Sequence, residues 1–338
     1  MRAAISDETP IVSVLMFVYN QSAYLEKSIQ SVIGQIGDFP AEVIIHDDAS
    51  TDGSRAIIQS YAERYPGIII PILQEENQMH QGIDFVKQFV MPRVRGKYLA
   101  YCEGDDYWIE PRKLLIQIKI LERHPEFSAV CHNCKVVDAD DNEIKPVRKF
   151  YPFKKNTVYT LNELAYEGRM PGQTASVVMR ASNMNDLPDE TRNQFRAIRH
   201  CVGDRKRTLL ILLSGNVLCL KRAMSAYRYV TEGGTSWNAR TKGKNLSGRY
   251  FVQEYDFRTF AEKYFDRELH NDYVLFGTGL MAFWRAAVNP SDDNLAQYKL
   301  VLDTLGGRKE LALFLVSCFP RALLTIPRRM IQELKWGI

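Results

Sequence analysis

The chain has no long apolar run, few cysteines and little net charge, and each of these limits what it can be. No segment offers about eighteen uninterrupted apolar residues, so no transmembrane helix is predicted. The pair Cys131 and Cys134 has no second pair at zinc-site spacing, so core thiols are expected there. A formal net charge of +4 over 338 residues, without interleaved aromatic and basic residues, argues against nucleic acid as a partner.

Three further features are missing. No signal segment precedes Ile11, and the six cysteines are scattered, so we expect a cytoplasmic protein with reduced thiols. No glycine-rich phosphate loop with a basic residue follows the first apolar run, which argues against a nucleotidyltransferase. We find no repeat or low-complexity run, and 46% hydrophobic residues suffice for one large domain with an appendage or for two domains.

Apolar runs and amphipathic segments alternate along the first part of the chain. Ser22 is the expected N-cap of the first helix, and Pro71 indicates that the third strand is short or near a sheet edge. The alternation predicts an α/β fold with a mostly parallel sheet and right-handed crossovers. Strands are expected at residues 11–18, 42–46, 68–73 and 98–101, with helices near residues 22–33, 57–65 and 85–90.

Two of the expected strands end in carboxylate pairs. Asp47 and Asp48 follow the second strand, while Asp105 and Asp106 follow the fourth, just after Glu103. Ligands of open α/β sheets bind at this edge, and Mg²⁺ or Mn²⁺ is usually held by one or two carboxylates together with phosphate oxygens. The pattern favours a metal–diphosphate site, although a solvated acidic turn after residue 101 would give the same residues.

Three ordered motifs carry a resemblance to a known family. They read V-S-V-L-M-F-V-Y-N at residues 12–20, I-I-H-D-D-A-S-T-D-G-S at residues 44–54, and Y-L-A-Y-C-E-G-D-D-Y-W-I-E-P-R-K-L at residues 98–114. The chain resembles family 2 glycosyltransferases, the inverting enzymes of the GT-A fold, of bacterial surface-polysaccharide type. The resemblance covers roughly residues 10–235.

The resemblance implies a particular domain organisation. It predicts a GT-A catalytic domain over residues 1–237, Rossmann-like, with a mostly parallel sheet flanked by helices. The nucleotide-sugar half would occupy about residues 1–135 and the acceptor half about residues 136–237. A basic loop and a helical C-terminal extension would follow over residues 238–338.

The resemblance also implies donor-site residues. Tyr19 and Asn20 would line the nucleobase pocket, although Val18 departs from the residue that often precedes them. Asp48 would bond the uracil edge, with the alternative that it caps a helix beginning near Ser50. The family's metal motif falls on residues 103–105. The implied ligand of Mn²⁺ or Mg²⁺ is Asp105, and Glu103 and Asp106 are the neighbouring carboxylates of the donor site. Glu103 departs from the aspartate of the family motif but keeps its negative charge.

The second half would supply the catalytic base and a basic loop. Asp204, preceded by glycine and followed by an apolar run, would take a proton from the acceptor hydroxyl; it could equally be a helix N-cap. Val230 replaces a histidine that the family uses at this point. Arg240 and Lys242 lie in an acid-free loop that would fold over the diphosphate, or would be simply mobile and solvated.

The activity implied is metal-dependent transfer of a hexose or N-acetylhexosamine from a nucleoside-diphosphate donor, with UDP as the expected nucleotide. The acceptor would be a glycan or a lipid-linked sugar in polysaccharide biosynthesis. Because Glu103 and Val230 depart from the family pattern, a catalytically inactive nucleotide- or glycan-binding scaffold of the same fold remains the alternative.

The C-terminal segment differs from the rest of the chain. The apolar run 311–316 is followed by basic residues and a tryptophan. Two interpretations remain open: a helix lying at the inner face of the cytoplasmic membrane on anionic lipid, or a helix packed on the catalytic domain with a solvated basic face. Pro320 and Pro327 are expected to break this segment into short helices. The basic and aromatic residues concerned are Arg321, Arg328, Arg329, Lys335 and Trp336.

Overall fold

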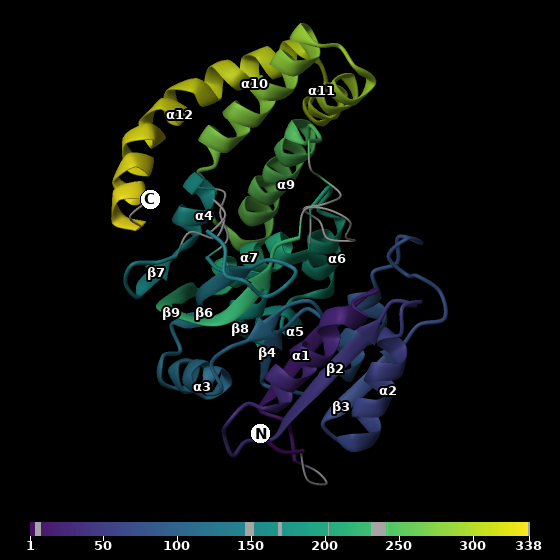
Figure 1. The fold of residues 1–338 in the computed structure, drawn as a ribbon. Helices are drawn as coiled ribbons and strands as arrows, with labels where there is room; N and C mark the ends of the chain where they lie inside the picture. The colour runs from purple at the N-terminus through teal and green to yellow at the C-terminus, as the bar shows by residue number, and fades with distance from the viewer. Residues whose placement is uncertain are drawn as a thin grey trace. The chain divides into compact units, whose positions relative to one another are not determined.

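The structure is a computed structural model that describes residues 1–3, 8–145, 152–167, 171–201, 203–230, 241 and 243–336. It divides into two compact units, each built from separated stretches of the chain. The first unit contains residues 1–157, 172–185 and 217–242. The second contains residues 158–171, 186–216 and 243–338, so that helices from the middle of the chain join those of the C-terminal extension (Figure 1).

The first unit is built on one sheet with the strand order β3-β2-β1-β4-β8-β6-β9-β5. Its strands are β1 (Val12–Val18), β2 (Ala41–Asp47), β3 (Ile69–Leu73), β4 (Tyr98–Tyr101), β5 (Tyr107–Trp108), β6 (Phe127–Val137), β8 (Val178–Arg180) and β9 (Asn216–Arg228). Its helices are α1 (Ser22–Ile33), α2 (Ser54–Arg64), α3 (Lys113–Arg123) and α5 (Ser182–Asn185). A short strand, β7 (Thr157–Tyr159), lies where the chain leaves this unit.

The first four strands form the parallel part of this sheet. β1 pairs in parallel with both β2 and β4, and β2 pairs in parallel with β3. The residues of β1 and β2 are buried on both faces almost throughout, as their continuous apolar sequences predict. Pro71 lies in β3, which is the edge strand. This confirms the expectation that the third strand lies near a sheet edge, because proline has no N–H to donate to a neighbouring strand.

Parallel pairs join four of the nine strands and antiparallel pairs follow β4, so the sheet is mixed where a mostly parallel one was expected. β8 pairs antiparallel with β4 and with β6, and β5 pairs antiparallel with β9. The expected helix near residues 85–90 is a short π-helical turn, Val86–Val90, followed by a 3₁₀ turn, Met91–Arg93. The α/β, GT-A-like arrangement of parallel strands and covering helices is otherwise the one expected.

The N-termini of α1 and α2 share one carboxylate, which corrects two capping predictions. Ser22 is the first residue of α1 and not its cap, since the N-cap position is Gln21, without a side-chain bond. Asp52 accepts the backbone N–H of Ser22 (2.8 Å) and that of Ser54 (3.0 Å). Burial alone would raise the pKa of Asp52, but hydrogen bonds from Ser54 and Ser22 lower it to about 2. Asp48 caps neither helix.

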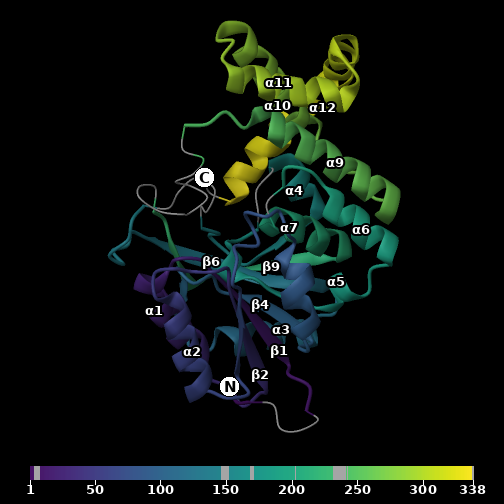
Figure 2. The ribbon, with the colours of Figure 1, turned by 90° about the vertical axis from the view of Figure 1, so that its right-hand side faces the viewer.

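The second unit is helical. Its helices are α4 (Leu161–Glu167), α6 (Asp189–Ala197), α7 (Gly203–Ser214), α9 (Ser247–Phe265), α10 (Asp272–Val288), α11 (Asp292–Leu305) and α12 (Arg308–Trp336) (Figure 2). A core between the last four helices contains Phe251, Leu275 and Val301. At Gly248 a Cβ atom would lie 2.0 Å from the carbonyl oxygen of Gln297, so glycine is required for the close approach of α9 and α11.

The expectation that prolines break the C-terminal segment is wrong. α12 runs through Pro320 and Pro327 as one helix of 29 residues, and it follows a curved path (Figure 1). Cys318 and Ala322 are buried on either side of Pro320, and packing of this face holds the helix together across a missing hydrogen bond. Within the part of the chain that the structure describes, no helix has the length and low charge needed to cross a bilayer.

Candidate active site

The ends of β1, β2 and β4 bring three loops to one edge of the sheet. Val18, the last residue of β1, pairs with Asp47, the last of β2, and Leu15 pairs with Tyr101 at the end of β4. Because the strands are parallel and adjacent, the residues that follow them meet at their carboxyl ends. Six of the predicted site residues therefore belong to this edge of the first unit: Tyr19, Asn20, Asp48, Glu103, Asp105 and Asp106.

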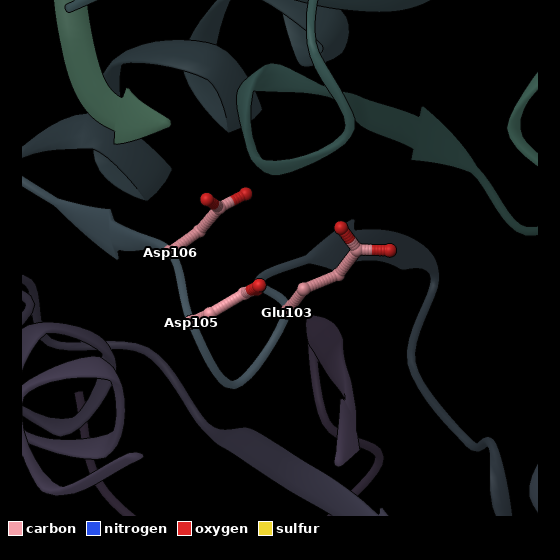
Figure 3. A group of neighbouring side chains, drawn as sticks. All are labelled: Glu103, Asp105 and Asp106. Carbon is pink, nitrogen blue, oxygen red and sulfur yellow. The ribbon is translucent and has the colours of Figure 1, made fainter. Parts of the chain in front are cut away.

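Three carboxylates of the loop after β4 form a potential metal site. One oxygen from each of Glu103, Asp105 and Asp106 lies within 4.8 Å of the others. The three side chains leave the same turn on the same side (Figure 3). Burial, and then the charges of Asp105 and Glu103, raise the pKa of Asp106 well above its usual value, while burial raises that of Asp105. A divalent cation would relieve this repulsion, and carboxylates are suitable ligands for Mg²⁺ or Mn²⁺, so the donor set fits the metal.

Asp106 is also bonded firmly to the protein. Its side chain is completely buried, and one oxygen accepts the backbone N–H of Arg228 at 3.0 Å while the other accepts the Nε2 amide of Gln173. Its own carbonyl oxygen accepts the hydroxyl of Ser28. Asp106 thus fixes the loop, while Glu103 and Asp105 are partly exposed and accessible to a ligand.

The guanidinium of Arg228 holds the acidic loop against a neighbouring turn. Its Nε donates to the carbonyl oxygen of Asp105 (3.1 Å), and Nη1 donates to those of Asp138 (2.8 Å) and Ala139 (2.9 Å). Nη2 forms an ion pair with Asp141 at 2.6 Å. The Arg228 side chain is only 2% exposed, so these groups take the place of the water it would otherwise bind.

Close packing beneath the loop explains its glycine. A Cβ atom on Gly104 would lie 2.4 Å from Oε1 of Gln21 and 3.1 Å from Val18. A hydrogen bond from the Gln21 side chain to Asp105 opposes the effect of burial on the pKa of that carboxyl group. The sequence interpretation gave no role to Gln21, Gln173 or Arg228. Arg228 lies two positions before Val230, and nothing in the sequence distinguished the two glutamines.

The nucleotide-side residues form a compact set of loops. Asn20 has a positive φ of 52°, its N–H donates to Ser50 Oγ (2.9 Å), and its Oδ1 accepts the N–H of Thr51 (2.8 Å). The ring of Tyr19 lies edge-to-face with that of His80, with their centroids 6.2 Å apart. Asn20 therefore joins the loops that follow β1 and β2, and Tyr19 contacts the loop after β3.

Asp48 is buried and its carboxylate already has two partners. Oδ1 accepts the backbone N–H of Gln78 (2.7 Å) and Oδ2 accepts that of Met79 (3.2 Å). Each carboxylate oxygen can accept more than one hydrogen bond, so these contacts are compatible with a further donor from a base. Asp48 thus shapes the loop on which His80 lies, and its contact with a nucleobase stays a prediction.

Asp204 belongs to the second unit, at the start of α7. It is the second residue of the helix, in its first turn, so it is not the N-cap that the sequence allowed as an alternative; its Oδ1 accepts the N–H of Arg205 at 2.7 Å. Arg205 is almost fully buried in an ion pair with Glu254 of α9. The basic residue next to Asp204 is therefore held by the protein. Arg240 and Lys242, the basic residues predicted to cover the diphosphate, lie outside the described residues.

Comparisons with known proteins agree with this arrangement. A family model described as "Glycosyl transferase family 2" matches residues 13–185. An uncharacterized protein of Mycobacterium tuberculosis is 34% identical over 228 residues, 66% of this chain and 60% of that protein. The putative teichuronic acid biosynthesis glycosyltransferase TuaG of Bacillus subtilis is 33% identical over 152 residues, 44% of this chain and 56% of TuaG.

Solved structures show the same fold. A crystal structure of S. aureus TarS, residues 1–349, aligns with a TM-score of 0.63 at 17% identity, covering 96% of this chain and 92% of that one. The chain spans about 60% of the length of the mycobacterial relative, so the comparison reaches only part of that protein. The family model covers half of the chain and includes every donor-site residue that the structure describes. The chain belongs to glycosyl transferase family 2 and has a GT-A-like fold.

Proposed function

We propose that this protein is an inverting, metal-dependent glycosyltransferase that uses a UDP-sugar. The observation that carries the proposal is the cluster of Glu103, Asp105 and Asp106 at the carboxyl end of β4, beside the loops that follow β1 and β2. The TarS structures of the same fold are complexes with UDP-GlcNAc and with UDP, which supports a UDP-sugar donor here. Asp105, with help from Glu103, would hold Mn²⁺ or Mg²⁺.

Each residue has a defined task in this proposal. Tyr19, Asn20 and Asp48 bind the nucleoside. The cation, when bound, neutralises negative charge on the departing diphosphate. Asp204 removes the proton from the acceptor hydroxyl as that oxygen attacks the anomeric carbon from the face opposite the diphosphate. One bond to the anomeric carbon forms while the other breaks, so the configuration inverts and UDP is released.

The acceptor side of the proposal rests on relatives and on charge. TuaG is described as acting in teichuronic acid biosynthesis, which supports a role here in making a surface polysaccharide. We propose a glycan or lipid-linked acceptor, with peripheral attachment of the protein to the membrane through its C-terminal region. The basic residues of α12 are suited to anionic headgroups.

Thermal unfolding with UDP, GDP, ADP and CMP, each with and without Mn²⁺, tests the donor site. A ligand at a hundred times its Kd adds about 2.7 kcal/mol to the free energy of unfolding. We expect stabilisation by UDP that requires Mn²⁺, that is lost in Asp105→Asn, and that survives in Asp140→Asn, an exposed aspartate of the same unit. Stabilisation by another nucleotide would overturn the assignment of Asp48 to uracil.

Asp204→Asn separates the enzyme from an inactive scaffold. UDP release from UDP-sugars should occur in the unchanged protein and fall at least about a hundredfold in the variant, with UDP binding retained. If UDP binds but no UDP-sugar is turned over with any acceptor preparation, the protein is a nucleotide-binding scaffold of this fold.

A further inference from the structure

Large apolar side chains are exposed on two neighbouring helices of the second unit. On α10 these are Leu280, Met281, Phe283, Trp284 and Val288; on α12 they are Leu313, Val316, Phe319, Leu323 and Leu324. Trp284 is 61% exposed, and Val316 and Leu324 are more than 70% exposed. Single exposed apolar residues are common on proteins, but a concentration of this kind marks a surface that binds something.

The exposed residues follow the helical period on the side opposite to the packed side. α10 buries Leu275, Gly279, Ala282 and Ala286. α12 buries Leu311, Cys318 and Ala322. Each helix is therefore already packed on one side. Its second apolar stripe is largely exposed, with ring contacts only from Phe283 to Tyr298 of α11 and from Phe319 to Phe276 among the described residues. A helix that is apolar on two sides buries one side in its own domain, and its other side is stabilised by contact with a further apolar surface.

α10 and α12 pack against each other. The rings of Phe276 on α10 and Phe319 on α12 are in contact, with their centroids 5.5 Å apart. A Cβ atom on Gly279, one turn after Phe276, would lie 3.4 Å from Leu315, one turn before Phe319. The exposed residues of α10 and α12 thus belong to adjacent helices joined at Phe276 and Phe319. We refer to the ten exposed side chains named above as the α10–α12 face.

The exposed charged residues of α10 and of α12 up to residue 324 are mainly positive, although Arg321 also lies 4.0 Å from Asp272. Arg285, Arg308, Lys309 and Arg321 are all exposed, whereas Glu310 is the one acidic residue of α12 before Glu333. No charged residue occurs between Glu310 and Arg321. The backbone of α12 continues as a helix to Trp336 and adds Arg328, Arg329 and Lys335 to its length.

We infer that the α10–α12 face binds the surface of an anionic lipid bilayer. The apolar side chains enter the boundary between headgroups and acyl chains, Trp284 lies at the headgroup level, and the arginines contact lipid phosphates. A protein partner would have to combine an apolar surface with an acidic rim, whereas an anionic bilayer offers both over any area. The proposed function attaches the C-terminal region to a membrane, and this inference assigns the attachment to α10 and α12 together. It rests on the proposed function only for the choice of a lipid surface as the partner.

Co-sedimentation with lipid vesicles tests the inference. The chain is mixed with vesicles of phosphatidylcholine alone or of equal parts phosphatidylcholine and phosphatidylglycerol, without donor or acceptor. We expect binding to the anionic vesicles that weakens with added salt. The double variant Val316→Glu/Leu324→Glu should reduce the partition coefficient at least about tenfold, because two apolar groups leave the interface and two negative charges are repelled by it. Ile36→Glu, at a 52% exposed apolar residue of the first unit, should bind as the unchanged chain does.

Tryptophan fluorescence gives a second readout. Emission should shift to shorter wavelength when anionic vesicles are added, and Trp284→Phe should remove most of that shift while leaving the fold unchanged. The vesicle assay contains no nucleotide and the UDP-binding assay contains no lipid, so either can fail while the other succeeds.

Two results would overturn the inference. The first is equal vesicle binding by the double variant and the Ile36 control, or no binding by the unchanged chain. The second is a dimer in solution that becomes a monomer in the double variant, because the face would then join two copies of the chain.

Discussion

Replacing Arg228 by methionine tests whether the acidic loop depends on a residue that lies 122 positions away in the sequence. The substitution keeps a long apolar stem and removes every donor of the guanidinium. The carbonyl oxygens of Asp105, Asp138 and Ala139 each lose a hydrogen bond, and Asp141 loses its ion pair. The backbone N–H of residue 228 still bonds Asp106, so the loop loses one attachment and keeps another.

The cost can be estimated from the burial of these groups. The Arg228 side chain is 2% exposed, and breaking a buried ion pair by removing one partner costs about 3–5 kcal/mol. Water can reach Asp141, which is 36% exposed, so the lower end of that range is expected. In a chain of this size a loss of about 3 kcal/mol lowers the unfolding midpoint by roughly 6 °C.

Lys221→Met is the matched control on the same strand. The Lys221 side chain is exposed, so its replacement should change the free energy of unfolding by at most about 0.5 kcal/mol. Urea unfolding gives the stability of both variants, and titration with UDP and Mn²⁺ below the unfolding midpoint gives the function of the loop. We expect Arg228→Met to weaken Mn²⁺-dependent UDP binding at least about tenfold, and Lys221→Met to leave it unchanged.

Two outcomes would refute the reasoning. Equal stability losses in the two variants would mean that the four acceptors of Arg228 find water at no cost. A large stability loss with unchanged UDP binding would mean that the guanidinium supports the fold and does not position the acidic loop.

Two further predictions concern buried charges. Burial lowers the pKa of Lys113 to about 7, below the ordinary value of a lysine, so the free energy of unfolding should decrease as the pH falls from about 10 to 7. Lys113→Met should therefore stabilise the protein at pH 7 by up to about 4 kcal/mol in urea unfolding, with a gain that shrinks towards pH 10; a gain independent of pH would contradict this. Glu254→Gln should lower kcat about tenfold with little change in donor KM, because Arg205 would lose the charge that fixes the start of α7, whereas Glu262→Gln, an exposed change on the same helix, should alter neither.

The sequence predicted those parts of the fold that depend on neighbouring residues. The strands before Tyr19, Asp48 and Glu103 are continuous apolar runs, and the structure contains each of them within a residue or two. Their parallel pairing follows from the helices between them. The carboxylates after β4 are close together because they are close in sequence, and no long-range contact was needed to predict the cluster.

What could not be predicted depends on contacts between distant residues. Gln173 and Arg228 reach Asp106 from positions 67 and 122 residues later, and neither spacing has a sequence signal. The cap of α1 comes from Asp52, and the sequence offered Ser22 as an equally good local candidate. Pro320 was expected to end a helix by a local rule, which the packing of α12 against α10 outweighs.

These contacts change what the carboxylate motif by itself can establish. Asp106 is bonded on both oxygens by Gln173 and Arg228, so it orients the loop whether or not it also binds a metal. Under the proposed function, the departure at Glu103 would matter less for catalysis than the sequence suggests, because a longer carboxylate on a loop held at its other end could still reach a shared cation. The loss of the histidine at Val230 is compatible with the same geometry, since the residue two positions earlier already ties β9 to the acidic loop. If both departures are tolerated for this reason, Mn²⁺-dependent UDP binding should be more sensitive to changes at Gln173 and Arg228 than to replacement of Glu103 by aspartate.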